Sequence, residues 1–247
     1  MTRIYLMEAR SEILKLARMK TYAMSTILFP LMFYCFFGLA MPSAQAGRPI
    51  MARYLIATYG AYAVMGATLY AFGVGVAVER GLGWLELKRA SPMPIGAWFF
   101  AKLAVSMVFG SAVILLLFAL GAGFGNVRMT AAQWLLTFGA LLAGAVPFCA
   151  LGLTIGNLAG PNSAPGTVNM IFMPLSFCGG LWLPYEFLPK AIQQVAQLLP
   201  SYHLGQIALA IQNAPGAGNV ALHVEALAAF AMLFLGTAWL AHQRAQA

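Results

Sequence analysis

The chain has 247 residues, of which 62% are hydrophobic and only 8% are charged, whereas a soluble domain carries about 25% charged residues. A surface with so few charges would not stay dissolved in water, so the composition indicates a protein embedded in a bilayer. The sequence has no Asp and only six Glu, which excludes most carboxylate-rich active sites and metal cages. Its three cysteines lie in apolar runs without CxxC or Cys/His ligand spacing. They are therefore expected to be small buried hydrophobic residues.

Long apolar runs in the sequence predict membrane-spanning helices. A helix needs about 20 apolar residues to cross the hydrocarbon core, and continuous runs favour helices over the alternating strands of a barrel. Six spans are predicted, at residues 22–42, 55–78, 98–124, 132–158, 168–183 and 221–242. The expected fold is an all-α membrane protein in which residues 1–247 form a single transmembrane domain. Its segments are 1–21, spans one and two at 22–78, a loop at 79–97, spans three to five at 98–183, an outer segment at 184–220, and the last span with its tail at 221–247.

Lysine and arginine predict the orientation, because basic residues near span ends are retained on the cytoplasmic side. With the N-terminus inside, ten basic residues fall on the cytoplasmic side and four on the outer side. The ten are Arg3, Arg10, Lys15, Arg18, Lys20, Arg80, Lys88, Arg89, Lys102 and Arg244, and the four are Arg48, Arg53, Arg128 and Lys190. Both termini are therefore expected in the cytoplasm. The net charge of +8 then sets topology and contacts anionic membrane lipid, and no nucleic-acid partner is expected.

The N-terminal segment and the fourth span carry two further patterns. Residues 1–21 interleave apolar and charged residues at helical spacing, which predicts an amphipathic helix on the inner leaflet. The fourth span contains Pro147, which is expected to kink it. It also contains a GxxxGxxxG ladder at Gly152, Gly156 and Gly160, which permits close approach of a neighbouring helix.

The outer segment is punctuated by three prolines, Pro184, Pro189 and Pro200. This spacing favours short re-entrant helices over a seventh crossing, since proline interrupts a helix. Val195 and Leu199 belong to the apolar side of the segment and are expected to face inward. They are candidates for an outer gate, and a static plug in the outer leaflet is the alternative.

Scarce charges gather in an island between the second and third spans, on the predicted cytoplasmic side. Apolar and charged residues alternate there, which predicts a short helix projecting from the membrane. Lys102 lies further along, and its ammonium is expected to snorkel back to the headgroups. One interpretation is a topogenic loop held inside by its positive charge. The other is a docking helix for a cytosolic partner, favoured by Trp84, since exposed aromatic residues beside arginine are typical interface anchors.

The stretch "ERGLGWLELKRASPMP" resembles the cytoplasmic loop of bacterial type-2 ABC exporter permeases, of the drug- and antibiotic-exporter kind. The family pattern is Glu-Arg, two variable residues, Gly, an apolar-Glu-apolar run, then a small residue and Pro. The matching positions are Glu79, Arg80, Gly83, Leu85, Glu86 and Pro92. Many members have Thr at the position of Trp84. The similarity extends to the N-terminal helix, the six-span plan and the "LP…LLPSYHL" segment before the last span.

This resemblance implies a permease subunit that pairs with a second permease copy, identical or homologous, and binds two copies of a cytosolic ABC ATPase. The loop would be the coupling helix seated in each ATPase. The residues implied for docking are Glu79, Arg80, Gly83, Trp84, Leu85, Glu86, Lys88 and Arg89. The chain has no GxxxxGK[ST] phosphate loop. ATP and Mg²⁺ are therefore expected on the partner ATPase, with no catalytic residue, metal or cofactor in this chain.

The expected function is export of an amphipathic or hydrophobic substrate, such as a drug, an antibiotic or a lipid-like molecule, across the bacterial cytoplasmic (inner) membrane. The path would lie between two protomers and be lined by apolar and aromatic residues. The candidates are Phe33, Phe36, Phe37, Tyr62, Met65, Tyr70 and Phe172, and ordinary helix packing is the alternative role for each.

Other functions have weaker support in the sequence. Export of a lipid-linked glycan, an ion or a metal would use the same kind of permease, although the 14 methionines are scattered along the chain and methionine commonly fills apolar gaps. An intramembrane enzyme would need polar residues at membrane depth. The candidates are Asn157, Asn169, His223 and Glu225, whereas His203 lies on the outer segment. No Ser/His or His/Glu group shares helical spacing within a span.

Overall fold

The computed structural model describes residues 2–90, 93–214 and 218–244. These residues form helices and loops without a strand, which confirms the all-α prediction. The first half of the chain contains α1 (Thr2–Arg18), α2 (Lys20–Phe33), η1 (Tyr34–Ala40), α3 (Pro42–Thr68), η2 (Leu69–Val74), α4 (Gly75–Gly81), α5 (Trp84–Ala90) and α6 (Ile95–Gly123). The second half contains α7 (Ala131–Ala143), α8 (Val146–Leu158), α9 (Ala164–Cys178), η3 (Tyr185–Phe187), α10 (Lys190–Ala196), α11 (Pro200–Ile211) and α12 (Val220–Arg244).

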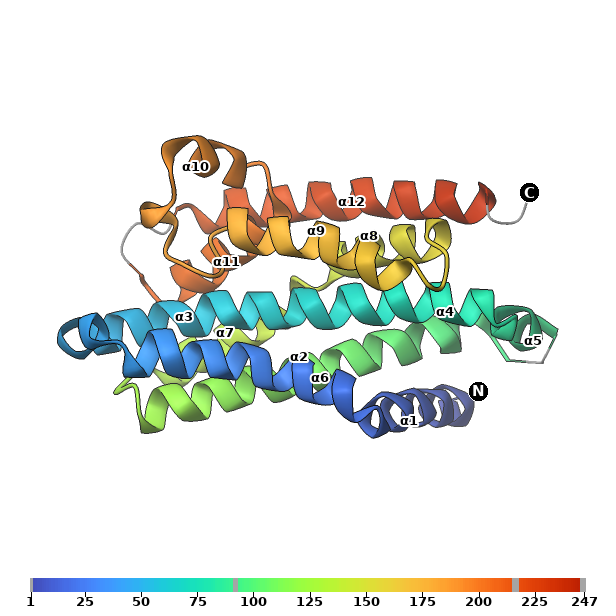
Figure 1. Cartoon of the computed structure of the whole chain (residues 1–247), viewed down its shortest axis with the longest axis horizontal. Helices are drawn as coiled ribbons and strands as arrows, with labels where there is room; N and C mark the ends of the chain where they lie inside the picture. Colours follow the sequence, from blue (N-terminus) through green and yellow to red (C-terminus); the bar gives the residue numbers. More distant parts are fainter. Residues whose placement is uncertain (1, 91–92, 215–217, 245–247) are drawn as a thin grey trace.

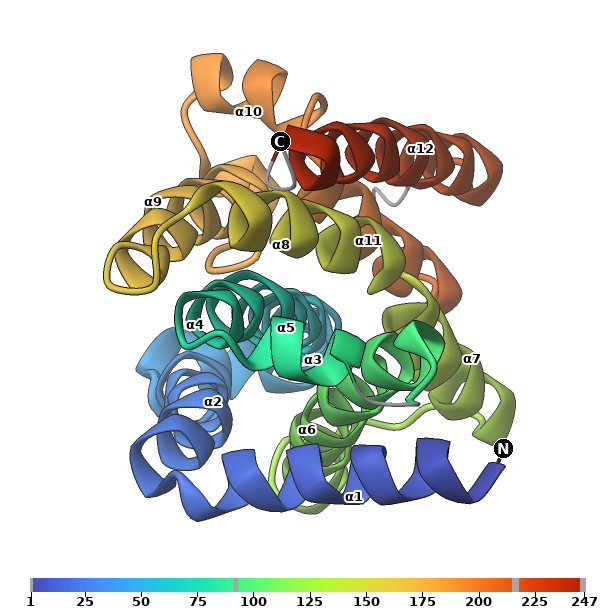
Figure 2. The ribbon, with the colours of Figure 1, turned by 90° about the vertical axis from the view of Figure 1, so that its right-hand side faces the viewer.

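The helices are arranged around one central rod, formed by α3, η2 and α4 without interruption. On one side of the rod lie α2 and α6, and on the other lie α8, α9, α11 and α12 (Figures 1 and 2). Helix α1 lies across one end of the bundle, transverse to the long helices (Figure 2). The same end carries α5 and the C-terminal end of α12, whereas α10 lies at the opposite end (Figure 1).

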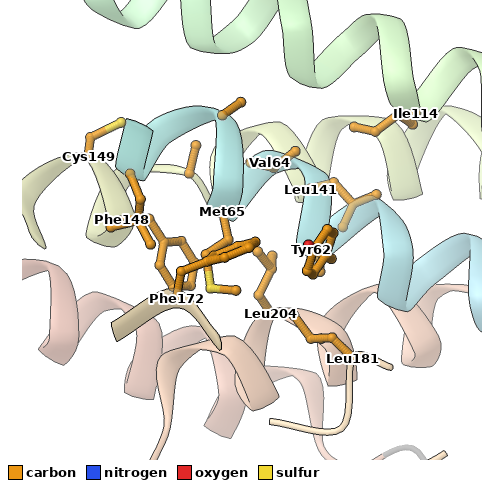
Figure 3. Packing of buried hydrophobic residues seen from close by; sticks show 14 of the residues in the cluster. Tyr62, Val64, Met65, Ile114, Leu141, Phe148, Cys149, Phe172, Leu181 and Leu204 are labelled. Carbon is orange, nitrogen blue, oxygen red and sulfur yellow. The ribbon is translucent and has the colours of Figure 1, made fainter. Parts of the chain in front are cut away.

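The middle of the central rod is apolar and largely covered by its neighbours, as expected for a helix enclosed in a bundle. Figure 3 shows Met65 in the middle of this core, with Phe172 from α9 and Leu204 from α11 close by. Leu141 from α7 and Phe148 from α8 complete the same cluster. The core therefore joins elements from both halves of the chain, consistent with one transmembrane domain.

Four helical segments are long and apolar enough to cross a membrane, namely Pro49–Gly81, Ile95–Gly123, Ala131–Leu158 and Val220–Ala241. They correspond to the predicted second, third, fourth and sixth spans, so the chain is a multi-pass membrane protein. The first predicted span corresponds to α2 and η1, whose described apolar part, Thr26–Ala40, is shorter. Helix α9 has only 15 residues, or about 22 Å, which is less than the hydrocarbon thickness of about 30 Å. The count of six spans thus stays a prediction.

The second span begins earlier than predicted. Residue 55 was the expected start, whereas α3 begins at Pro42 and runs through Arg48 and Arg53. A proline at the first helical position costs no hydrogen bond and presets the backbone angle, so the helix restarts directly after η1. The outer end of the rod is consequently helical and carries basic residues.

The fourth span is broken at the predicted place. Helix α7 ends before Gly144 and α8 begins at Val146, with Pro147 in its first turn. Two rungs of the glycine ladder then pack on the central rod. A Cβ at Gly152 would lie 2.9 Å from Phe72 Cβ, and one at Gly156 would lie 2.6 Å from the Phe72 carbonyl oxygen. Only glycine allows this separation, so the ladder holds α8 against η2 and α4.

The outer segment forms the short helices predicted for it. Pro184 and Pro189 directly precede η3 and α10, and Pro200 begins α11. Helix α11 is buried along most of its length, whereas α10 stands away from the bundle (Figures 1 and 2). Each proline lacks an N–H that would otherwise need a partner, which explains why every helix of this segment starts at or after one.

Candidate functional site

A cluster of three glutamates and three lysines lies at the end of the bundle that carries α1 and α5. Its members are Glu8, Glu12 and Lys15 of α1, Glu79 of α4, Lys88 of α5 and Lys102 of α6. The charges balance, three against three, and the cluster holds half of the six acidic residues of the chain. Since charged groups are rarely buried without partners, the cluster fixes four helices relative to one another.

The centre of the cluster is the pair formed by Lys102 and Glu79. Lys102 Nζ lies 2.6 Å from Glu79 Oε1 and 3.0 Å from Glu12 Oε2. Trp98 Nε1 donates to Glu79 Oε2 at 2.7 Å. The expectation that Lys102 snorkels to the headgroups is wrong, because its side chain is 2% exposed and its ammonium points inward. The buried carboxylates hold it there.

Lys15 joins α1 to this centre from the solvent side. Its Nζ lies 2.7 Å from Glu79 Oε1 and 3.0 Å from Glu12 Oε1. Burial alone would lower the pKa of Lys15, but the hydrogen bonds and charges of Glu79 and Glu12 outweigh it and raise that pKa above its ordinary value. Lys15 is therefore a stable cation at neutral pH, and the cluster keeps its balance of charge.

Helix α5, the predicted coupling helix, is held to α1 and α4 by Lys88 and is exposed over part of its surface. Lys88 Nζ lies 2.7 Å from Glu8 Oε1, and Lys15 Nζ lies 5.5 Å from the centre of the Trp84 ring. Leu87 is 70% exposed and Trp84 is 43% exposed. Gly83 precedes the helix with φ of +70°, a conformation that other residues rarely adopt. The helix thus presents an aromatic and aliphatic surface at the end of the bundle.

The residues assigned to docking do not all lie on that surface. Glu86 and Leu87 are exposed on α5, and Leu85 is half-buried. Glu79 is 1% exposed inside the ion cluster. Its carboxylate cannot reach a partner in this conformation, so its role here is to position α1 and α6.

Arg80 is also turned inward. Its guanidinium donates to the carbonyl oxygen of Ala159 at 2.7 Å and to that of Asn157. It thereby supplies partners for the free carbonyls at the end of α8, which a helix terminus requires. Arg89 belongs to α5 but its side chain lies outside the described part of the structure, as does residue Pro92. Accessible candidates for docking are therefore concentrated between Trp84 and Leu87.

Part of the predicted substrate path lines a groove between α2 and α9. A cavity of about 210 Å³ is bordered by Tyr62, Tyr70 and Phe172. The rings of Tyr62 and Phe172 lie 4.8 Å apart. Tyr70 donates its hydroxyl hydrogen to Asn169 Oδ1 at 2.6 Å, which places one polar pair in an otherwise apolar groove.

The other path candidates lie in different surroundings. Phe33 is 5.0 Å from the ring of Trp182 and stacks on Phe37 at 5.8 Å. Phe36 is exposed on η1, and Met65 is wholly buried in the core. The structure therefore brings together the candidates of α3, η2 and α9 at one cavity, continues them toward Trp182 through Phe33, and leaves Met65 as a packing residue.

Sequence reasoning missed a second cavity, of about 490 Å³, at the end that carries α5. It is mostly apolar, and its walls include Leu85 of α5, Trp98 of α6 and Trp239 of α12, with Lys88 at its edge. These residues come from three helices spread over most of the sequence. No local pattern marks them as neighbours, although Trp at the end of an apolar span does indicate a membrane interface.

Sequence reasoning named His203 and His223 but missed that they form a buried pair. Nδ1 of His203 lies 2.8 Å from Nδ1 of His223, and Nε2 of His203 lies 3.0 Å from the Gln197 carbonyl oxygen. A carbonyl only accepts, so His203 donates from Nε2 and, when neutral, accepts at Nδ1 from His223. Burial lowers the pKa of His203. The pair joins α11 to α12, whereas Glu225 is exposed nearby in sequence and does not take part.

The outer-gate candidates are only partly where they were expected. Val195 is 49% exposed in the single chain, and Ala196 is the buried residue of α10. The assignment of Val195 to a gate between two protomers stays a prediction. Leu199 is half-buried just before α11. Gln193 donates to the Leu188 carbonyl oxygen at 2.8 Å, and Tyr185 donates to that of Gln193 at 3.0 Å. These bonds bind α10 to η3 and leave Val195 pointing outward.

The fold and its charged end define the class of protein: the chain is a multi-pass helical membrane protein with a short helix exposed at one end of the bundle. A family model described as "ABC-2 type transporter" matches residues 5–213. The chain therefore belongs to the ABC-2 type transporter family of membrane domains. It is 29% identical over 226 residues to a protein of Bacillus subtilis (strain 168) named "Putative transport permease YvfS", a match that covers 91% of each chain. The family implies a transport subunit, an ATPase partner and a dimeric assembly in general.

Proposed function

We propose that this chain is the permease subunit of an ATP-driven exporter in a bacterial cytoplasmic membrane. It moves an amphipathic or hydrophobic substrate, of the drug, antibiotic or lipid type, and works with a second permease copy and two separate ATPase subunits. ATP and Mg²⁺ are held by the ATPase. The proposal adds the direction of transport, the substrate class and the copy numbers to the family membership.

The observation that carries the proposal is the way α5 is mounted. Lys88 fixes α5 to Glu8 of α1, and the Glu79–Lys102 pair fixes α4 to α6 a few ångströms away. A push on the exposed face of α5 would therefore be transmitted to α1 and to the central rod together. A loop that only sets topology would not need ion pairs to two other helices, α1 and α4, because orientation depends on charge alone.

The aromatic groove between α2 and α9 supports the choice of substrate. Its walls are apolar, and the described polar contact in it is the bond between Tyr70 and Asn169. Such a wall binds apolar surface by removing it from water, and it offers no fixed charge with which to select an ion. A path of this kind favours a hydrophobic or amphipathic molecule over a metal ion.

The test is co-purification of an ABC ATPase with the tagged chain from native membranes. Leu87→Ala and Trp84→Ala should reduce the amount of ATPase recovered and its hydrolysis activity, since losing a central contact in an interface typically costs about 2 kcal/mol or more. The matched control is Leu198→Ala at the opposite end, because Leu198 is 73% exposed and Leu87 is 70% exposed. Equal loss in the control, or no loss in either α5 variant, would contradict the docking role.

A further inference from the structure

A cavity of about 780 Å³ lies at the end of the bundle opposite to α1 and α5. Its lining comes from α3 between residues 49 and 54, from the α6–α7 loop, from η3 with the residue before it, and from the two residues 213–214 after α11. The ribbon in Figure 1 shows α3 and α11 reaching this end of the bundle. The charge distribution assigns this end to the outer side of the membrane. The cavity is distinct from the aromatic groove between α2 and α9, with which it shares no lining residue.

Two arginines line this cavity, although outer segments are the places where basic residues are depleted. Arg53 comes from α3 and Arg128 from the α6–α7 loop. They are two of only four basic residues on the predicted outer side. Orientation is set by lysine and arginine on the other side of the membrane, so it does not explain a pair of arginines at one outer cavity.

Neither arginine has a partner within the described part of the chain. The ion pairs there involve other residues, and Nε of Arg53 is buried without a hydrogen-bond acceptor. A buried donor left without an acceptor costs about 1–3 kcal/mol, and more when it is charged. A guanidinium presents five donors in a fork that fits the oxygens of a phosphate. Both guanidinium groups are therefore available to bind an anion.

The other residues that line the cavity provide further hydrogen-bond donors and an apolar wall. Asn126 and Asn213 both border the cavity from left-handed turn positions, with φ of 52° and 55°, and their amides are further donors for an anion. Ile50 and Phe187 provide exposed apolar wall. Glu186 is the single acidic residue of the lining, so the cavity carries a net charge of +1 from two arginines and one glutamate.

We propose that this outer cavity binds the anionic phosphate headgroup of an amphiphile, with both arginines on the phosphate and the apolar tail along Ile50 and Phe187. The ligand is either an outer-leaflet phospholipid or a phosphate-bearing lipid-like cargo, which share this chemistry. A role in releasing cargo rests on the proposed export function. Binding itself does not, since the cavity is complete in one chain.

The experiment measures binding of dihexanoyl-phosphatidylglycerol to the purified full-length chain in detergent, by microscale thermophoresis. Dihexanoyl-phosphatidylcholine and inorganic phosphate are the comparison probes. The phosphatidylglycerol should bind more tightly than either one, because only it combines net negative charge with a tail. Arg128→Gln and Arg53→Gln should each weaken its binding by about tenfold or more, as loss of a charge-assisted hydrogen bond predicts.

Two matched variants test whether the effect belongs to the cavity. Lys190→Gln removes a positive charge at the same end, from the start of α10 and outside the lining, and should leave affinity unchanged. Glu186→Gln should tighten binding, since it removes the opposing charge. Arg128 lies in an exposed loop, so its variant tests the site even where Arg53→Gln fails to fold.

Three results would overturn the inference. Equal affinity of Arg128→Gln and the unchanged protein would remove the arginine site. Equal weakening by Lys190→Gln would reduce it to general attraction. Binding of inorganic phosphate as tight as that of phosphatidylglycerol would show an anion site without a tail. These binding measurements do not depend on the ATPase, so they would be unchanged if no ATPase co-purified. A failure of the proposed function can therefore be distinguished from a failure of this inference. If a cargo that co-purifies with the chain competes with phosphatidylglycerol for the cavity, the ligand is cargo. If no such competition is seen, the ligand is bilayer lipid.

Discussion

Replacing Lys102 by Met should destabilise the protein through the charges that it leaves behind. Lys102 is 2% exposed and lies 2.6 Å from Glu79 and 3.0 Å from Glu12, which are 1% and 5% exposed. Methionine keeps the length of the side chain but leaves three glutamates facing two lysines. Breaking a buried ion pair on one side costs about 3–5 kcal/mol. We expect about 3 kcal/mol, because Lys15 and Trp98 still bond to Glu79.

Thermal unfolding in lipid nanodiscs, followed by tryptophan fluorescence, measures this loss. With about 2–4 °C per kcal/mol for a chain of this size, Lys102→Met should lower Tm by roughly 6–12 °C. The double variant Glu79→Gln/Lys102→Met restores the balance of charge, and its loss should be less than half of the sum of the two single losses. Glu225→Gln, at an exposed position of α12, is the control and should change Tm by less than about 1 °C. A Tm shift below about 2 °C, or additive losses in the double variant, would refute the account of a buried cluster in which each charge depends on its partners.

Three further predictions concern packing, pH and orientation. Gly156→Ala should lower the yield of folded protein, because its Cβ would lie 2.6 Å from a backbone oxygen of η2. The control is Gly139→Ala, whose Cβ would have nothing within 4 Å and should be tolerated. Equal yields of the two variants would argue against the close contact. Stability should fall as pH drops below about 6.5, since the unfolded state then takes up a proton that the lowered pKa of His203 denies to the folded state. His203→Gln should flatten Tm between pH 7 and 5, and a slope that persists would assign the effect elsewhere. In a cysteine-free background on intact cells, an impermeant thiol reagent should label a cysteine at Gln194 and spare one at Leu87, and the reverse pattern would invert the topology.

The amino-acid sequence by itself determined the class of protein, because bilayer insertion depends on local composition. Apolar runs long enough to span hydrocarbon identify membrane helices without knowledge of their neighbours. Proline acts on its own backbone, so the break at Pro147 and the starts near Pro184 and Pro189 could also be predicted. A short helix in the charged island could be predicted as well, and it is found at α5, since its alternation of apolar and charged residues is again a local signal.

Only the tertiary structure decided which charges and rings meet. Glu79 and Lys102 stand 23 positions apart, and Glu12 is 90 positions from Lys102, so nothing local shows that they form one buried cluster. The same holds for His203 and His223, and for Arg53 of α3 and Arg128 of the α6–α7 loop, which line one cavity. A charged side chain near a span end is read from sequence as exposed to water or headgroups, because isolated burial is too costly. Its burial becomes possible only when the fold brings an opposite charge within about 3 Å, and that proximity is a property of the packed helices.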